Sequence, residues 1–258
     1  MKRLFLGTVA LLALAAVGVV GASAAPTPMN WTGIFIGANG AFQSSNADYK
    51  FGLEGSGGCQ SNNIFCNVFA PYTGGHFGQH SNGQGFGGQV LFNIQNPTSH
   101  WAVGLEGSFS QPNLTVESKN VFGTGRVNAT ATYDTAVRSL ITVTPRVGYA
   151  TGSTLVFVKG GLALAREATA LSQSSAVEGC PCAFSGSHYF SGYTFGAGAD
   201  WAFHPGWTAG IEYDYARLGS QHFGGDTPAT VQPTTTWATG YDVRSDLSSV
   251  VVRVNYKI

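Results

Sequence analysis

Residues 154–167 read TLVFVKGGLALARE, and their side chains alternate in character along the chain. One face carries Val156, Val158, Leu162 and Leu164, and the other face carries Phe157, Lys159, Gly161 and Glu167. A period of two is typical of a β-strand, because side chains on a helix recur every 3.6 residues. The segment therefore predicts a strand with one apolar face and one face that is mainly small or polar.

The same alternation recurs along the rest of the chain. It is found in residues 34–42, 85–95, 101–109, 141–149, 189–203, 207–215 and 250–258, which brings the predicted strands to eight. The composition agrees, with 36 Gly, 17 Phe, 10 Tyr and 5 Trp but only 10% charged residues, against roughly 25% in a soluble domain. Such a mixture excludes collagen, a coiled coil and a highly charged disordered chain.

The predicted connections alternate in length. The short ones are residues 95–99, 150–153 and 204–206, and the long ones are about 43–84, 111–129, 171–187 and 218–241. Short turns therefore share one end of the strands and long loops the other, as in transmembrane barrels with an even number of strands. A closed barrel also satisfies every backbone group in hydrocarbon. We predict an all-β fold, a single eight-stranded antiparallel transmembrane β-barrel with short periplasmic turns and long extracellular loops.

The first 24 residues have the features of a cleaved secretory signal peptide. Lys2 and Arg3 precede the apolar residues 4–20, and Ala22-Ser23-Ala24 is a small-x-small cleavage signal. The expected domains are a signal peptide at 1–24 and an outer-membrane β-barrel domain at 25–258. Removing Lys2 and Arg3 leaves 11 basic and 13 acidic side chains, a net charge of −2, so a nucleic-acid partner is not expected.

As an ordered set, these segments resemble a known family. They are WTGIFIGANGAF, GFGGQVLFNIQ with WAVGLEGSF, PRVGYA with LVFVKGGLALA, TFGAGADWAFHPGWTAGIEYDYARLG, and VVVRVNYKI. The resemblance is to the small outer-membrane barrels of alphaproteobacteria, called porin-family or outer-membrane immunogenic proteins. It implies a role in envelope integrity and surface-exposed loops. Family members usually end in Phe, whereas this chain ends in Ile258, so recognition by the barrel-assembly machinery is expected to depend on Tyr256 and nearby Val residues.

The inward faces carry most of the charge. Alternation places in the lumen Glu106, Arg138, Arg146, Lys159, Glu167, Asp200, Glu212, Asp214 and Arg253, together with Asn39, Gln89 and Asn255. Side chains fill the interior of an eight-stranded barrel, and unpaired buried charges are costly. We therefore predict a polar network that pairs across strands. A catalytic pair of Glu212 and Asp214 is the alternative, although Arg253 offers each a structural partner.

Other motifs give no catalytic, cofactor or metal site. Residues 83–88 match G-x-G-x-x-G, but no strand precedes them and no helical pattern follows, as a dinucleotide site requires. His76 and His80 lack the Glu of a zinc-protease helix. The expectation is a non-enzymatic protein without a cofactor.

Four cysteines fall in two predicted long loops, Cys59 and Cys66 in the first, Cys180 and Cys182 in the third. Export to an oxidising compartment favours disulfides, and three pairings are open. A bond between Cys59 and Cys66 is local, whereas a bond between Cys180 and Cys182 closes a tight ring, which favours links between loops. Zinc binding is the alternative.

These patterns predict an integral protein of the bacterial outer membrane with a structural or surface-interaction role. A narrow porin-like channel is the alternative, followed by a secreted soluble barrel that binds a small apolar ligand. The expected partners are outer-membrane lipid, the barrel-assembly machinery through the last strand, and a surface partner of the extracellular loops. In the first loop, the aromatic residues Phe65, Phe69, Tyr72 and Phe77 are expected to form a cap over the barrel mouth.

Overall fold

The computed structural model describes residues 29–54, 76–96, 98–124, 127–175, 183–226 and 238–258. Its elements are all strands. They are β1 (Gly33–Glu54), β2 (His76–Gln95), β3 (Trp101–Pro112), β4 (Leu114–Thr124), β5 (Val127–Thr151), β6 (Thr154–Ser175), β7 (Ala183–His204), β8 (Trp207–Leu218), β9 (Gln221–Asp226) and β10 (Ala238–Lys257). In these ranges there is no helix with the length and hydrophobicity needed to cross a membrane.

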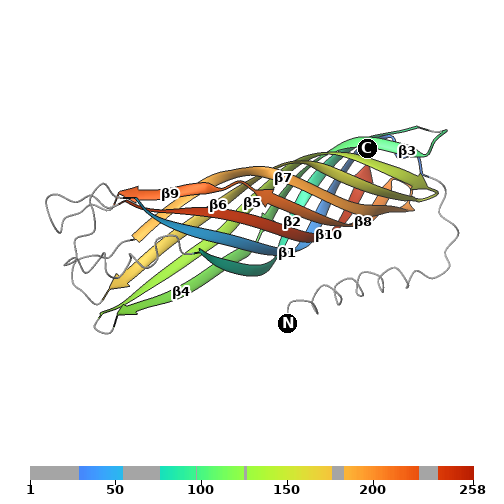
Figure 1. Cartoon of the computed structure of the whole chain (residues 1–258). Coiled ribbons are helices and arrows are strands. Elements are labelled where there is room, and N and C mark those ends of the chain that lie inside the picture. Colours follow the sequence, from blue (N-terminus) through green and yellow to red (C-terminus); the bar gives the residue numbers. More distant parts are fainter. Residues whose placement is uncertain (1–28, 55–75, 97, 125–126, 176–182, 227–237) are drawn as a thin grey trace.

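The strands form one closed antiparallel barrel (Figure 1). Neighbours in sequence pair around the wall, and β1 pairs with β10 from Phe35–Lys257 to Glu54–Ala238, which closes the ring. β3 and β4 both pair with β5 and together occupy one position in the wall. β8 and β9 share another position beside β10. The ten strands therefore make the eight-stranded barrel that the sequence predicts.

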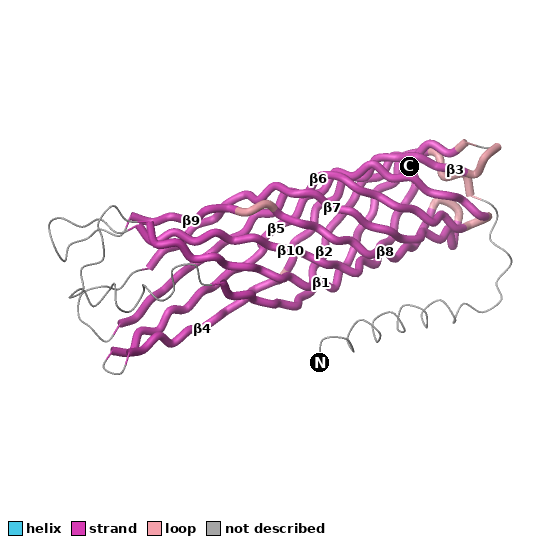
Figure 2. Tube along the Cα trace, viewed as in Figure 1, coloured by secondary structure: helices cyan, strands magenta, loops and turns pink. Residues whose placement is uncertain are grey.

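The barrel is much longer than the predicted strands. A strand of 22 residues such as β6, at about 3.3 Å per residue and tilted by about 40°, rises roughly 55 Å, about twice the apolar band of an outer-membrane barrel. Figure 2 shows the strands continuing toward the end where β4 and β9 lie. The predicted loop boundaries were wrong here, since β1 continues to Glu54 and β2 already includes His76, inside the predicted loop 43–84. Outside hydrocarbon the outward face is polar, as at Asn46 and Asp48, and the buried inward face also holds polar residues such as Gln43 and Ser45. The sequence therefore loses its alternation of apolar and polar residues there.

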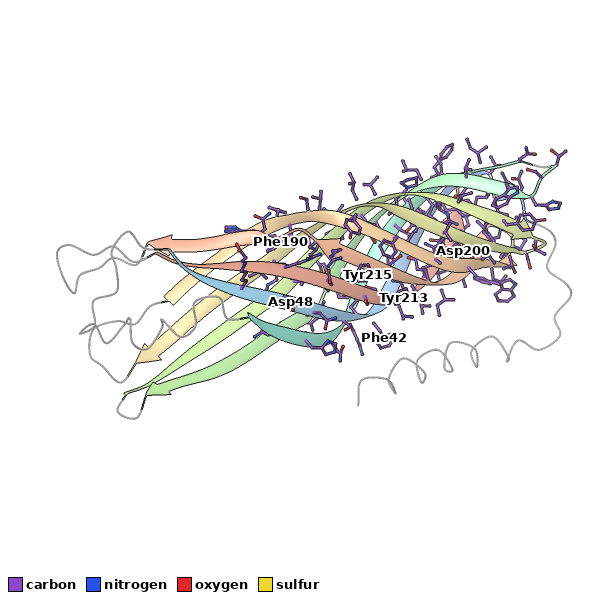
Figure 3. All side chains as sticks on the ribbon, viewed as in Figure 1. Phe42, Asp48, Phe190, Asp200, Tyr213 and Tyr215 are labelled. Atoms are coloured by element: carbon purple, nitrogen blue, oxygen red, sulfur yellow. The ribbon has the colours of Figure 1, made fainter. Side chains whose placement is uncertain are left out.

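The outer surface carries an apolar band that faces lipid. Val156, Val158, Leu162, Val252 and Val254 are all exposed on it, between 41% and 69%. At the end with the short turns, Trp101 packs edge-on against Tyr149 at 5.5 Å, and Trp207 lies 5.0 Å from Tyr256. Figure 3 shows side chains projecting outward around the wall. Such aromatic pairs mark a membrane interface.

The lumen is layered, and its inward faces hold more large apolar side chains than the predicted mainly small or polar face. Near the short turns an apolar layer contains Trp31, Phe35, Ala102, Leu91, Ala150, Leu155 and Ala202. Toward the opposite end a second apolar layer contains Leu114, Val137, Leu140, Ala163, Ala165, Phe190, Ala216, Leu218 and Leu247. Most of the buried charged groups lie between these layers, whereas Glu167 lies beyond Ala165 of the second layer. Alternation predicts the inward positions, but it does not predict that apolar side chains occupy many of them.

Candidate functional site

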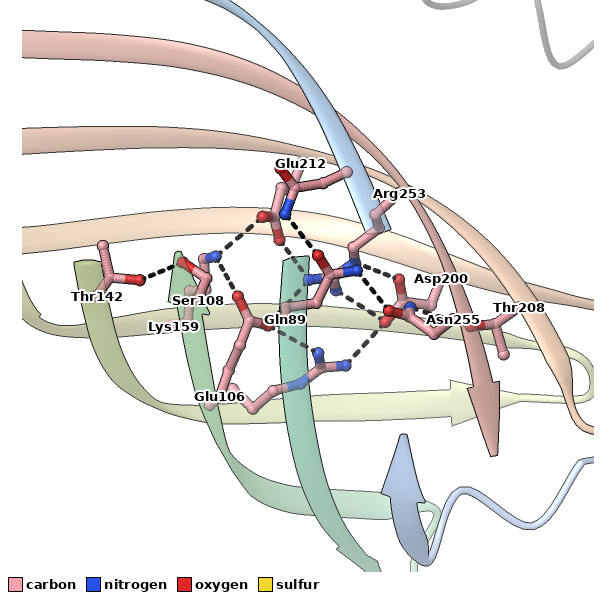
Figure 4. A network of polar contacts seen from close by, with 12 residues as sticks. Gln89, Glu106, Ser108, Thr142, Lys159, Asp200, Thr208, Glu212, Arg253 and Asn255 are labelled. Atoms are coloured by element: carbon pink, nitrogen blue, oxygen red, sulfur yellow. Dashed lines mark hydrogen bonds and ion pairs between the residues drawn. The ribbon is translucent and has the colours of Figure 1, made fainter. Parts of the chain in front are cut away.

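Arg253 of β10 is the centre of an ion-pair network in the lumen (Figure 4). Its Nε and Nη2 lie 2.9 Å from Oδ1 and Oδ2 of Asp200. Its Nη1 lies 2.9 Å from Glu106 Oε2 and 2.8 Å from Glu212 Oε2. One guanidinium group thus serves three carboxylates, which uses the planar, forked geometry that suits arginine to carboxylates.

Two further cations complete the network. Arg146 contacts Asp200 at 2.9 Å and Glu106 at 3.3 Å. The Nζ atom of Lys159 lies 2.7 Å from Glu106, 3.0 Å from Glu212 and 3.2 Å from Asp214. Glu106 therefore contacts all three cations and lies at the point where the contacts converge.

The network joins strands around most of the barrel. Its members come from β3, β5, β6, β7, β8 and β10. Six of the seven side chains are at most 5% exposed, and Asp214 is 21% exposed. Four carboxylates against three cations leave a formal charge of −1 when every group is ionised, and Asp214, the extra acid, is the most exposed member. Each buried charge of this network thus has an opposite charge within contact distance, which offsets the cost of removing it from water.

Phe157 is part of this site, although it was not among the predicted site residues. Its ring lies under the guanidinium groups of Arg146, 4.1 Å away, and Arg253, 4.7 Å away. The ring is 2% exposed, and an aromatic face attracts such cations. Alternation had already placed Phe157 on the inward face, so a lone aromatic residue opposite inward arginines was the available signal.

A separate, neutral chain of hydrogen bonds in the lumen includes residues of β1 and β2. Asn39 donates to Gln89 at 2.5 Å, and Gln89 donates to Asn255 at 2.6 Å. Asn255 in turn donates to Thr208 at 3.2 Å. A cavity beside the charged groups leaves about 40 Å³ for the centres of water molecules, room for a few waters only.

Two predicted lumen residues lie apart from the network. Glu167 is fully buried, and its Oε2 accepts a hydrogen bond of 3.4 Å from Ser245 Oγ. Arg138 lies on the outer surface, so its predicted lumen position was wrong. The pairing register of β5 shifts between Val137 and Ser139, and one extra residue there reverses the alternation.

Several predictions fall on residues outside the described ranges. These are the signal peptide and the residues Cys59, Cys66, Cys180, Cys182, Phe65, Phe69 and Tyr72. His80 is described, and its ring nitrogen lies 2.9 Å from Asn46 Oδ1 on the outer surface. Within the described ranges, no three His, Cys, Asp or Glu residues are grouped so that they could hold a metal ion.

Several solved structures of outer-membrane proteins are similar to this chain. The outer membrane protease OmpT of Escherichia coli is 8% identical, with 88% of this chain and 97% of that chain covered and a TM-score of 0.50. OprG of Pseudomonas aeruginosa is 12% identical, with coverage of 92% and 99% and a TM-score of 0.47. Ail, the attachment invasion locus protein of Yersinia pestis, is 13% identical, with coverage of 88% and 100% and a TM-score of 0.38. A comparison with curated protein sequences gave no match.

The family comparison covers nearly the whole chain. The outer membrane protein beta-barrel domain matches residues 8–256. The match agrees with the closed barrel, its apolar outer band and its aromatic residues at the short-turn end. The chain belongs to the outer membrane protein beta-barrel domain family and is an integral protein of the bacterial outer membrane.

Proposed function

We propose that this barrel is closed to ions and acts as a structural element of the outer membrane, with its extracellular end available to surface partners. The observation that carries the proposal is the set of contacts that Arg253 makes with Asp200, Glu106 and Glu212 across the lumen. A conducting path would have to pass these charges, which hold one another at contact distance.

The two apolar layers support the same proposal. Ion conduction needs a continuous wet path, and apolar constrictions close such a path by excluding water. The charged network lies between an apolar layer that includes Leu155 and another that includes Phe190. The cavity beside the network has room for only a few waters. Water and ions therefore meet a barrier on each side of the network.

A non-enzymatic role is part of the proposal. Glu212 and Asp214, the pair that could suggest acid–base chemistry, both contact Lys159, at 3.0 Å and 3.2 Å. Glu212 also contacts Arg253. Such ion-pair arrangements stabilise structure, although they can imitate an active site. The proposal also includes export with cleavage after Ala24 and loop disulfides, which N-terminal sequencing and thiol counting of purified protein would check.

The alternative is a narrow diffusion channel, and conductance separates the two. Purified full-length protein is inserted into planar bilayers, and current is recorded at fixed voltage. We expect no steady conductance from the natural protein. The same current is recorded for Lys159→Ala, which frees space beside the cavity, and is compared with that of the natural protein. Val158→Leu on the lipid face is the matched control. Regular, ion-selective steps from the natural protein would overturn the closed-barrel proposal and establish the channel.

A further inference from the structure

Two arginines stand side by side on the outer surface of the barrel. Arg138 is exposed on β5 at the register shift, and the next residue, Ser139, pairs with Arg166 of β6. Arg166 is exposed as well. The register shift therefore brings a second cation to the face on which Arg166 lies, where unbroken alternation would have turned Arg138 inward.

The two arginines lie at the extracellular edge of the apolar band. The preceding outward residue on β6 is Leu164, 47% exposed, and the following outward residue on β5 is Ile141, 42% exposed. Both of these apolar side chains lie on the membrane side of the arginines. Beyond the arginines, β6 continues to Ser175. This position corresponds to the level of lipid headgroups in the outer leaflet.

Neither cation has a carboxylate partner among the residues that the structure describes. Arg166 donates through Nη2 to Ser187 Oγ at 3.3 Å, and its guanidinium lies 6.0 Å from the ring of Tyr189. These contacts orient the group without neutralising it. Arg138 has no hydrogen-bond or ion-pair partner within the described ranges.

A third outward arginine provides the contrast. Arg217 of β8 also faces outward, but its Nε lies 3.4 Å from Asp246 Oδ1 of β10. Its charge is therefore balanced within the barrel wall. Arg138 and Arg166 are different, because two neighbouring unbalanced guanidinium groups repel each other unless an anion lies between them.

From this arrangement we propose that Arg138 and Arg166 bind a phosphate group of an anionic lipid in the outer leaflet. Guanidinium groups suit phosphate because two parallel N–H donors match two oxygens. Tyr189, 69% exposed beside Arg166, and Leu164 offer apolar contacts to the acyl chains of the same molecule. Those contacts favour a lipid over free phosphate in solution.

The test uses the full-length protein refolded in phosphatidylcholine vesicles. The vesicles contain lipid A with its phosphates intact, lipid A with its phosphates removed, or no addition plus inorganic phosphate in the buffer. The readout is the midpoint of thermal unfolding, followed by the change in gel migration, as a function of lipid A content. Since a ligand that binds the folded state raises this midpoint, the titration gives an apparent affinity.

We expect intact lipid A to raise the midpoint more than the dephosphorylated form does. In R138Q/R166Q the apparent affinity should fall about tenfold or more, whereas R217Q should keep it. The variant R138K/R166K keeps the charges but loses the forked donors, so it should lie between the two and serves if the glutamine variant fails to fold. Equal effects of both lipid A forms, stabilisation by inorganic phosphate alone, or an equal loss in R217Q would overturn the proposal.

Discussion

The guanidinium group of Arg253 holds the carboxylate of Asp200 through two contacts of 2.9 Å, Nε to Oδ1 and Nη2 to Oδ2. Arg253 lies on β10 and Asp200 on β7, and β8 separates these strands in the barrel wall. The pair therefore connects strands that share no backbone hydrogen bonds. The pair links these strands across the lumen, so its removal should destabilise the whole barrel.

Replacing Asp200 by Ala should lower the free energy of unfolding by about 3–5 kcal/mol, because it removes the two-point partner of the buried Arg253 and one of the two carboxylates that contact Arg146. The measurement is a urea titration of the protein in lipid vesicles, followed by gel migration. Asp246→Ala is the control, since Asp246 pairs with Arg217 near the surface and is 25% exposed. That change should cost at most about 1 kcal/mol. An equal loss of unfolding free energy in the two variants would show that the lumen pair contributes no more to stability than the surface pair.

Replacing Val158 by Arg should cost roughly 2–4 kcal/mol, because Val158 is 55% exposed within the apolar band and a cation there enters hydrocarbon. Val158→Leu keeps the surface apolar and should be nearly neutral. Labelling of Val158→Cys checks the orientation independently. Rapid reaction with a water-soluble reagent, and slow reaction with a lipid-phase one, would mean that the two faces have been exchanged.

Gly161 should not tolerate even a methyl group. A Cβ atom at this position would collide with the backbone oxygen of Val143 on β5, the strand that pairs with β6. We expect Gly161→Ala to destabilise the barrel by about 1–3 kcal/mol through overpacking. Gly107→Ala is the matched control, because no atom lies within 4 Å of a Cβ built there. Urea titration compares the two, and equal midpoints would contradict the expected collision.

Protease added to intact cells should cut between β1 and β2, within residues 55–75, and leave the turn between β2 and β3 intact. The reason is that long connections of such barrels face outward and short turns face the periplasm. Mass spectrometry of the fragments locates the cut. If cysteines of this segment form disulfide bonds, reducing these bonds before adding the protease should increase cleavage. Cleavage in the turn between β2 and β3, with 55–75 protected, would reverse the topology.

The strands within the membrane could be predicted because lipid imposes a strict rule on them. Val156, Val158 and Leu162 had to face outward, which fixed Lys159 as an inward residue and led to the lumen carboxylates. Above the membrane this rule ends. The polar residues at the upper end of β1, such as Asp48 and Lys50, are both exposed, and the sequence showed them as loop.

Alternation alone could not predict the outward position of Arg138 or the contacts of Phe157 within the site. The outward position of Arg138 depends on a single extra residue in β5. In a strand, a shift by one residue moves each side chain to the opposite face. Phe157 was placed on the correct face, but its contact with Arg146 and Arg253 brings together β6, β5 and β10. Such a contact depends on which inward side chains lie at the same level of the lumen in the closed barrel. A local sequence pattern does not contain this information.

The pairing of β1 with β10 also dictates the order of assembly. Phe35 meets Lys257, so the partners lie at nearly opposite ends of the chain. The wall cannot close until the final strand has been synthesised and delivered, and contacts so distant in sequence form slowly. Until that moment β1 presents an unpaired edge that hydrocarbon cannot satisfy. A chain that loses its last strand is therefore expected to remain in the periplasm as a target for chaperones and proteases, and never to become a smaller barrel.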